Sequence, residues 1–298
     1  MNNVGLVVLN YNSFEDTIYC VKKLASFDKG YHIIVVDNHS TDESVIKIET
    51  ELSNIKNVDI IYSEINNGYS AGNNYGMKYA IKQYDVDVVG ILNPDVIIPN
   101  ENVIDKICEA LFSDEQYAIA GGVAINAKGE YNINFSCWDI PTRRDLVWNH
   151  LIINNRMAKN RILTTVNNNI ALTECVAGCF FLAKTSAMEK MRFLDENVFL
   201  YNEENLLGIK CKKAGYKEIV VLDQFYIHNH KHKKGEKIPF KKKIMITHNG
   251  YVSRKYLCET YYGKGILPAL WCVELLNKIF LALCYFKNVL LYLLRCTT

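Results

Sequence analysis

The sequence predicts an α/β fold with a mostly parallel central sheet, and two observations carry this prediction. The run Val4–Leu9 is apolar throughout, as expected of a strand buried on both faces of a parallel sheet. Further apolar runs alternate with segments of helical periodicity that start after turn-forming residues. Strands that alternate with helices imply right-handed βαβ units.

The expected elements follow this alternation along the chain. Ser13 or Asn12 caps the first helix, Asp42 opens the second, and Gly215 ends the last. The expected strands are 4–9, 31–36, 58–62, 87–92, 118–125, 129–138, 174–183 and 217–222. The expected helices are 13–27, 42–55, 70–83, 103–112, 185–191 and 203–214.

The charge distribution divides the 298-residue chain into two parts. Residues 1–230 carry 21 Lys and Arg against 29 Asp and Glu, whereas residues 231–298 carry 13 against 3. The ten cysteines are scattered without a CxxC pair, which favours reduced thiols in the cytosol. We therefore expect a catalytic domain at 1–230, a basic helical region at 231–298 and no signal peptide.

The C-terminal region combines basic clusters with an apolar helix. The clusters are Lys231–Lys237 and Lys241–Lys243, and the apolar run is Ile279–Leu294. On a helical wheel the polar residues share one narrow face: Glu274, Asn277, Lys278, Tyr285, Asn288, Tyr292 and Arg295. This pattern predicts peripheral binding to an anionic membrane surface. The alternative is a helix that packs on the body of the protein or on a second subunit.

Polar motifs follow the predicted strands at the points where the strands end. Asn10-Tyr11-Asn12, Asp37-Asn38 and Asn93-Pro94-Asp95 follow three of them, and Glu203-Glu204 opens a late helix. Ligands of open α/β sheets bind at the carboxyl ends of the strands. The motifs therefore predict a site for a nucleotide and a metal ion.

The residue types suggest separate roles within this site. Asp37 could accept hydrogen bonds from a base or ribose, or cap the next helix, and Tyr11 could stack on the base. The loop 66–74 is rich in Gly and Asn, which allows a ligand close to the backbone or simply makes a turn.

The acidic residues and one histidine are the candidates for metal binding and catalysis. Asp95 is the candidate ligand for Mg²⁺ or Mn²⁺, which proteins often hold through one or two carboxylates plus substrate phosphates. His228 could reach the same diphosphate or metal, or be structural. Glu203 and Glu204 either complement the helix dipole or supply a general base. Neighbouring helical side chains point about 100° apart, so only one is expected to face the site.

Six motifs within residues 4–230 carry a family resemblance: Asn10-Tyr11-Asn12, Val36-Asp37-Asn38, Asn67-Gly68-Tyr69-Ser70-Ala71-Gly72-Asn73-Asn74, Asn93-Pro94-Asp95, Phe193-Leu194-Asp195-Glu196 and Tyr201-Asn202-Glu203-Glu204. Together they resemble inverting family 2 glycosyltransferases of the GT-A fold, close to the rhamnosyltransferase-like branch of bacterial surface-polysaccharide synthesis. Three positions depart from the family pattern. Asn93 replaces the first Asp of a DxD motif, Glu204 replaces the usual Asp, and Leu206 replaces an acid.

The resemblance implies roles for individual residues. Glu204 would be the catalytic base, with Glu203 as the other candidate, and Asp95 with His228 would bind Mn²⁺ or Mg²⁺. The residues implied in binding the nucleotide sugar are Asn10, Tyr11, Asn12, Asp37, Asn38, Asn67, Gly68, Gly72, Asn73, Asn93, Asp95 and His228.

The resemblance also implies a reaction. A dTDP- or UDP-linked sugar, with rhamnose favoured, would pass to a hydroxyl of a lipid-linked saccharide for capsule or O-antigen synthesis. The enzyme would act on the inner face of the cell membrane, without a nucleic-acid partner, and a homodimer is left open. A nucleotidyltransferase or dehydrogenase is disfavoured because no glycine-rich loop follows the first strand. The remaining alternative is a degenerate, non-catalytic subunit of a membrane assembly complex.

Overall fold

The computed structural model describes residues 2–126, 129–130, 133–152, 163–167, 169–229 and 239–296. The chain divides into two compact units. The first comprises residues 1–140, 158–196 and 203–231, and the second comprises residues 141–157, 197–202 and 232–298. The basic cluster Lys231–Lys237 lies outside the described residues.

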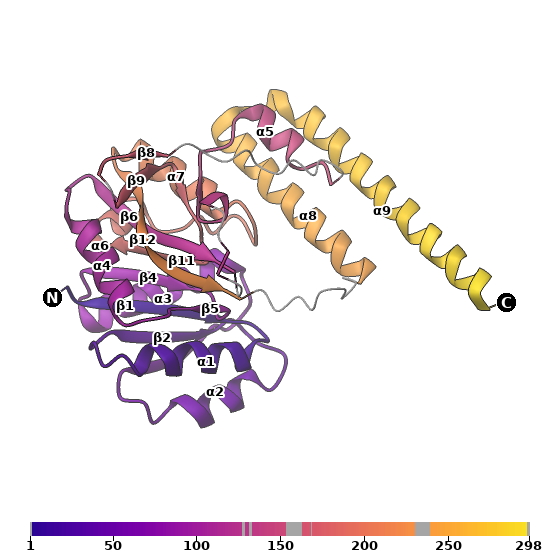
Figure 1. The fold of residues 1–298 in the computed structure, drawn as a ribbon. Coiled ribbons are helices and arrows are strands. Elements are labelled where there is room, and N and C mark those ends of the chain that lie inside the picture. The colour runs from indigo at the N-terminus through magenta and orange to yellow at the C-terminus, as the bar shows by residue number, and fades with distance from the viewer. Residues whose placement is uncertain are drawn as a thin grey trace. The chain divides into compact units, whose positions relative to one another are not determined.

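A mixed, mostly parallel sheet forms the centre of the first unit (Figure 1). Its strands run in the order β3-β2-β1-β4-β11-β6-β12-β9-β8, and β5 pairs with β12. The parallel members are β1 (Val4–Asn10), β2 (His32–Asp37), β3 (Val58–Tyr62), β4 (Val88–Leu92), β6 (Tyr117–Ile125) and β12 (Lys217–His228). The antiparallel members are β5 (Val96–Ile97), β8 (Thr164–Thr165), β9 (Ile170–Thr173) and β11 (Phe180–Lys184).

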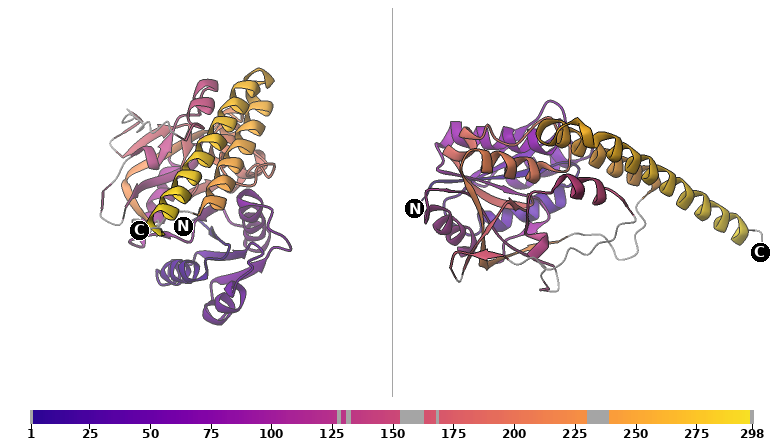
Figure 2. Two further views of the ribbon diagram at one scale, coloured as in Figure 1. Left: turned by 90° about the vertical axis from the view of Figure 1, so that its right-hand side faces the viewer. Right: turned by 90° about the horizontal axis from the view of Figure 1, so that it is seen from above.

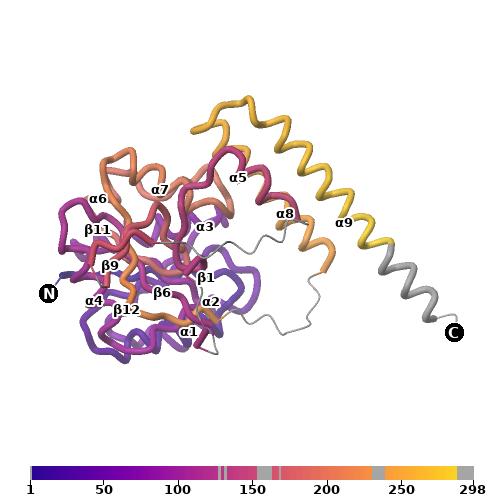
Figure 3. The backbone as a smooth tube through the Cα atoms, turned by 45° about the horizontal axis from the view of Figure 1, so that its top comes forward, coloured from indigo at the N-terminus to yellow at the C-terminus, as the bar shows by residue number. Residues whose placement is uncertain are grey.

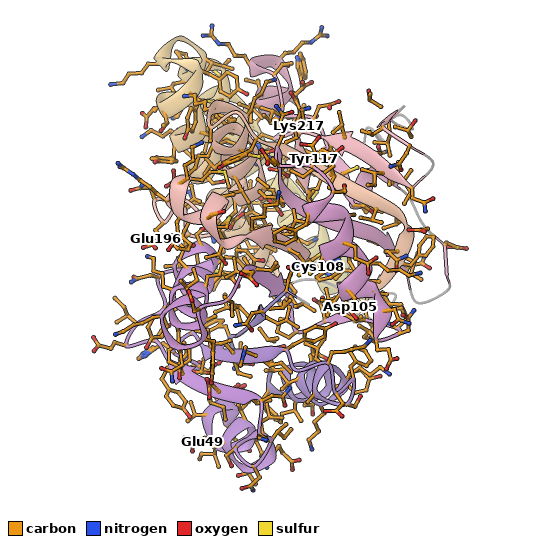
Figure 4. All side chains as sticks on the ribbon, turned by 90° about the vertical axis from the view of Figure 1, so that its left-hand side faces the viewer. Glu49, Asp105, Cys108, Tyr117, Glu196 and Lys217 are labelled. Atoms are coloured by element: carbon orange, nitrogen blue, oxygen red, sulfur yellow. The ribbon has the colours of Figure 1, made fainter. Side chains whose placement is uncertain are left out.

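Helices cover both faces of this sheet, as Figure 2 shows from two further sides. On one face, apolar side chains pack from α1 (Phe14–Ala25), α2 (Ser44–Leu52) and α4 (Asn102–Phe112). On the other face they pack from α3 (Tyr69–Tyr84), α6 (Thr185–Lys190) and α7 (Glu203–Lys213). Figure 4 labels Asp105 and Cys108 on α4, and Tyr117 and Lys217 where β6 and β12 start side by side. This arrangement confirms the predicted fold class.

The expected elements differ from the structure mainly in the second half of the unit. The expected strand 129–138 is wrong, because residues 133–135 form a 3₁₀ turn, and among the described residues of this segment only β7 (Cys137–Trp138) is a strand. The expected strand 174–183 is split into β10 (Cys175–Val176) and β11 by a turn around Gly178. Strand β12 runs six residues beyond the expected end at 222, because β6 and β5 pair with its far half.

The α-helices α5, α8 and α9 belong to the described residues of the second unit (Figure 3). Helix α5 (Arg143–Trp148) starts with a capping box made by Thr142 and Asp145. Helices α8 (Phe240–Leu257) and α9 (Leu267–Cys296) form a hairpin, with a turn that uses a positive φ of 83° at Gly263. The sequence predicted a helix over the apolar part of α9 but did not predict α5 or α8.

Candidate active site

The carboxyl ends of β1, β2, β4 and β12 bring the predicted polar motifs to one edge of the sheet. Asn10 and Asp37 are the last residues of β1 and β2 and are register partners. Asn93 follows β4, and its backbone N–H donates to the carbonyl of Cys179, 2.8 Å away. His228 ends β12, and the N–H of Asn229 donates to the carbonyl of Asp95 (2.9 Å). Residues far apart in sequence thus share this edge.

The buried side chain of Asp37 accepts hydrogen bonds from Asn10, at the end of β1, and from the loop after β2. It is 2% exposed, and its Oδ2 accepts from Asn10 Nδ2 at 2.8 Å. Its Oδ1 accepts from the backbone N–H of Ser40 at 2.9 Å. Asn10 itself is fully buried and accepts from the Thr17 hydroxyl (2.8 Å). Two of roughly four acceptor positions of the carboxylate are thus used within the protein.

A second set of bonds joins the loops that follow β1 and β2. Asn12, with a φ of 51°, accepts from the N–H of Thr41 (2.8 Å) and donates to its hydroxyl (3.1 Å). The N–H of Asn12 also donates to Ser40 Oγ at 3.0 Å. These bonds fix Asn12 and with it the backbone next to Tyr11, whose side chain is 47% exposed. Tyr11 is therefore available for stacking.

The glycine-rich loop approaches β1 and Asn38 closely. Asn38 Nδ2 donates to Asn66 Oδ1 (3.0 Å) and to the carbonyl of Gly68 (3.2 Å). A Cβ on Gly72 would lie 2.5 Å from Leu9 Cδ1, so no larger residue fits without a shift. The predicted Asn67 is exposed, whereas Asn66 makes the structural contact that the sequence analysis missed.

Tyr69 joins this loop to the Asn93-Pro94-Asp95 motif. Its hydroxyl donates to the carbonyl of Gly178 at 2.6 Å and lies 3.2 Å from Asn93 Oδ1. Burial raises the pKa of Tyr69 well above its usual range, and the nearby Glu204 and Glu203 raise it further. Tyr69 therefore stays protonated and acts as a hydrogen-bond donor. The sequence analysis did not single it out, because its partner lies 109 residues away.

Backbone N–H groups hold the Glu204 carboxylate beside Gly178. The N–H of Gly178 donates to Glu204 Oε1 at 3.2 Å. Burial raises the pKa of Glu204, while the N–H groups of Glu204 and Gly178 partly oppose the shift. Glu203 is 6% exposed, whereas Glu204 is only partly buried. Glu204 thus combines an anchored carboxylate with access from solvent.

We expect Gly178→Ala to lower turnover without unfolding the protein. The added Cβ would lie 2.7 Å from Glu204 Oε1, so the flexible carboxylate must move away. A misplacement of about 1 Å can cost about 100-fold in rate. We therefore expect kcat to fall by that order while Tm changes little. Gly265→Ala, where a Cβ would meet no atom within 4 Å, is the control. Equal turnover in the two variants would contradict the placement of Glu204.

His228 and Asp95 face each other across the same edge. His228 Nε2 lies 3.4 Å from Asp95 Oδ2, and both side chains are partly exposed. Burial alone would lower the pKa of His228, but the interactions with Asp95 and Cys179 raise it to about 10. The described residues contain no group of three or more His, Cys, Asp or Glu side chains arranged around one metal position. Asp95 and His228 nevertheless fit a hard divalent ion whose remaining ligands are phosphate oxygens and water.

A second buried carboxyl group, that of Glu218, lies near Glu204. Glu218 on β12 is 3% exposed, and its Oε2 accepts from the N–H of Val176 at 2.8 Å. Burial raises its pKa well above the usual range, the Val176 N–H partly opposes this, and Glu204 and Glu174 raise it further. The sequence analysis missed Glu218, because one acid near the start of a predicted strand gave no signal.

Glu218→Gln should change the pH dependence of stability. Because the folded-state pKa of Glu218 is raised, the wild type loses stability as pH rises from the unfolded-state pKa towards the folded one. Gln keeps an acceptor for Val176 and carries no charge. We expect urea unfolding between pH 4.5 and 8 to show a smaller loss of stability with pH in the variant, and a more stable variant at pH 8. Parallel pH profiles would contradict this account of Glu218.

Solved structures of similar fold are glycosyltransferases. The mannosyltransferase PcManGT from Pyrobaculum calidifontis, in complex with GDP-Man and Mn²⁺, is similar to this chain with a TM-score of 0.53 and 15% identity over 98% of this chain and 81% of that one. S. aureus TarS in complex with UDP-GlcNAc is similar with a TM-score of 0.52 and 16% identity, over 84% of this chain and 66% of the TarS chain. The chain thus has the GT-A fold of these two proteins.

The family follows from the sequence itself. The model of Glycosyl transferase family 2 matches residues 6–186, so the chain belongs to this family. The low-salt glycan biosynthesis hexosyltransferase Agl10 of Haloferax volcanii is 25% identical over 68% of this chain and 60% of its own length. The rhamnosyltransferase WbbL of Escherichia coli is 22% identical over 71% of this chain and 78% of its own length. The predicted family and enzyme class are confirmed; the chain spans less than two thirds of Agl10.

Proposed function

We propose that this chain is an inverting glycosyltransferase. It moves a sugar from a nucleoside-diphosphate sugar to a hydroxyl of a lipid-linked saccharide during synthesis of a bacterial surface polysaccharide. The observation that supports the proposal is the contact chain Glu204–Gly178–Tyr69–Asn93, which connects the Glu204 carboxylate, the proposed base, to the motif that contains Asp95. A base and a diphosphate site on one sheet edge are what sugar transfer requires.

The donor would occupy the edge from the loops after β1 and β2 to the end of β12. Tyr11 is exposed for stacking on the base, while Asp37, Asn10, Asn12 and Asn38 fix the loops around it. Asn67 is exposed and would line the sugar side of the donor pocket, next to Asn93, whereas the buried Gly68, Gly72 and Asn73 would shape the loop that carries it. We propose dTDP-rhamnose as the first donor to test, in view of the likeness to WbbL, and a UDP-sugar as the second.

Asp95 and His228 would hold Mn²⁺ or Mg²⁺ against the diphosphate. When bound, the ion supplies positive charge that stabilises the leaving diphosphate. The PcManGT structure contains Mn²⁺ with a nucleotide sugar, which supports this proposal. His228 must lose its proton before it can act as a ligand, so metal binding should strengthen as pH rises.

The chemical step is a single displacement. Glu204 accepts the proton of the acceptor hydroxyl, whose oxygen forms the new bond to the anomeric carbon. The bond from that carbon to the diphosphate oxygen breaks, and the diphosphate leaves with the electron pair. Attack from the face opposite the leaving group inverts the configuration, through an oxocarbenium-like state related to that of glycoside hydrolysis.

Calorimetry with dTDP, UDP and GDP, each with and without Mn²⁺, tests the proposal, followed by turnover of the matching nucleotide sugar. Metal-dependent binding of one nucleotide and release of its diphosphate on addition of an acceptor would support the transferase. Binding without turnover, with every acceptor class supplied, would favour the non-catalytic alternative that the substitutions Asn93 and Leu206 suggest. Leu206 is fully buried, so the position where the family often has an acid is part of the apolar core in this chain.

The acceptor and the place of action belong to the same proposal. The basic C-terminal region and the apolar helix α9 suit an enzyme that works on a lipid-linked substrate at the inner face of the cell membrane. The names of Agl10 and of the minor teichoic acid biosynthesis protein GgaB of Bacillus subtilis, 26% identical over 61% of this chain, place those relatives in glycan and teichoic acid biosynthesis.

A further inference from the structure

Helix α9 presents apolar side chains on its exposed side. Trp271 and Leu276 are 57% and 54% exposed, and Leu283 and Phe286 are 63% and 66% exposed. Between residues 267 and 286, Lys278 is the only exposed charged side chain. Surface helices of soluble proteins show the opposite pattern, with the polar face towards water.

Two polar residues of α9, Glu274 and Asn277, are buried, whereas Lys278 and Tyr285 are exposed. Glu274 and Asn277 are 3% and 1% exposed. Glu274 Oε2 lies 3.0 Å from His150 Nε2, just after α5. Asn277 donates to the carbonyl of His150 (2.7 Å) and accepts from the N–H of Ile152 (2.9 Å). Glu274 and Asn277, two members of the polar face seen in the sequence, therefore make an internal contact with the segment after α5, while the apolar side chains named above are left exposed.

These contacts oppose a membrane-spanning role for α9. The segment Lys264–Phe286 is long and apolar enough to cross a membrane. Crossing would place Glu274 and Asn277 in the hydrocarbon, where buried polar groups must keep their partners. The partners at 150–152 and the packed helix α8 would have to enter too, and α8 begins with the exposed residues Lys241–Lys243. The pair α8–α9 suits a position in the plane of the interface.

We propose that the α8–α9 hairpin is an in-plane anchor for an anionic lipid bilayer, with the exposed apolar side of α9 among the acyl chains. Lys241–Lys243 would meet anionic headgroups, each basic residue contributing to surface attraction. Helix α8 adds the exposed apolar side chains of Met245 and Val252. The inference deepens the proposed function, because it rests on the proposal of a lipid-linked acceptor.

The positive charge of the C-terminal region favours a bilayer over a second copy of the chain as the partner of the exposed apolar side of α9. Residues 231–298 carry 13 basic against 3 acidic residues. Two copies joined through α9 would bring these positive regions together, whereas an anionic membrane attracts them. Lipid therefore complements both the apolar surface and the charge of the hairpin.

Tryptophan depth distinguishes an in-plane helix from a spanning one. The chain has three tryptophans, so the probes are made in a Trp138→Phe, Trp148→Phe background. Trp271 is one probe, and Leu276→Trp and Leu283→Trp, each with Trp271→Phe added, are the other two along the exposed side of α9. The full chain is bound to vesicles of 70% phosphatidylcholine and 30% phosphatidylglycerol, and bromines at known acyl positions quench the probes. We expect one shallow depth for all three probes. Depths that differ by about 18 Å between 271 and 283 would show a spanning helix and overturn the proposal.

A charge substitution tests the surface itself. We expect Leu283→Glu to weaken flotation with these vesicles at least tenfold, whereas Ile46→Glu, on α2 and 68% exposed, should bind like the wild type. Vesicle binding unaffected by Leu283→Glu, or a dimer in sedimentation that Leu283→Glu dissociates, would overturn the proposal. Nucleotide binding in solution is measured in parallel: if it fails while the vesicle results hold, the donor proposal is wrong and the anchor stands.

Discussion

Glu204→Gln is expected to lower kcat by about 100- to 10,000-fold, because general base catalysis typically contributes this much. Gln keeps an acceptor for the N–H of Gly178, so the local structure should survive. It cannot take a proton from the acceptor hydroxyl. Donor affinity should stay at the wild-type level, since the base is proposed to act on the acceptor.

The pH profile offers a second view of the same residue. Because burial raises the pKa of Glu204, the wild-type rate should rise with pH through a value above that of an ordinary glutamate. Glu203→Gln is the matched control, with the same chemical change at the neighbouring position. Loss of turnover in Glu203→Gln, with near-normal turnover in Glu204→Gln, would assign the base to Glu203.

The sheet edge was predictable because it depends on local patterns. Asn10 and Asp37 follow unbroken apolar runs, and two such parallel strands must end at the same edge. The contacts that tune the site were not predictable in this way. Tyr69 and Gly178 meet across 109 residues, and Glu218 approaches Glu204 only because β12 lies beside the segment that contains Val176. Such contacts depend on topology rather than on the neighbours in sequence.

The C-terminal region shows a different kind of limit. A helical wheel separates the polar and apolar faces of α9 but does not say which face the protein buries. The partner of Glu274 is His150, 124 residues earlier, in a stretch without clear periodicity. The sequence placed Glu274 and Asn277 on one polar face with other residues but did not identify this partner. The structure places them inside and leaves Leu276 and Leu283 exposed.

The second large effect is expected for Asp95→Asn, which should weaken Mn²⁺-dependent donor binding by at least about 100-fold. Removing a residue that only hydrogen-bonds to a metal ligand typically lowers metal affinity 10- to 100-fold. Asp95 is proposed as a ligand itself, and as the one carboxylate ligand, so the loss should be at least as large. The change removes a charge but keeps the side-chain shape. Asp28→Asn removes the same charge at an exposed position after α1 and should bind like the wild type.

The same variant should change the behaviour of His228. Without the carboxylate 3.4 Å from Nε2, the pKa of His228 should fall from its raised value, which is about 10. A histidine whose pKa is raised in the folded state adds stability that is fully present below the unfolded-state pKa, about 6.5, and is lost as pH rises through the folded-state pKa. At pH 7 most of this contribution is still present. Asp95→Asn should therefore reduce the stability of the metal-free protein at pH 7. NMR titration of His228 and calorimetry with Mn²⁺ measure the two effects separately. An unchanged Mn²⁺-dependent donor affinity would show that Asp95 does not bind the metal, even if the pKa of His228 falls. The fall in pKa reports only that Asp95 lies close to His228, whereas metal binding requires the Asp95 carboxylate as a ligand.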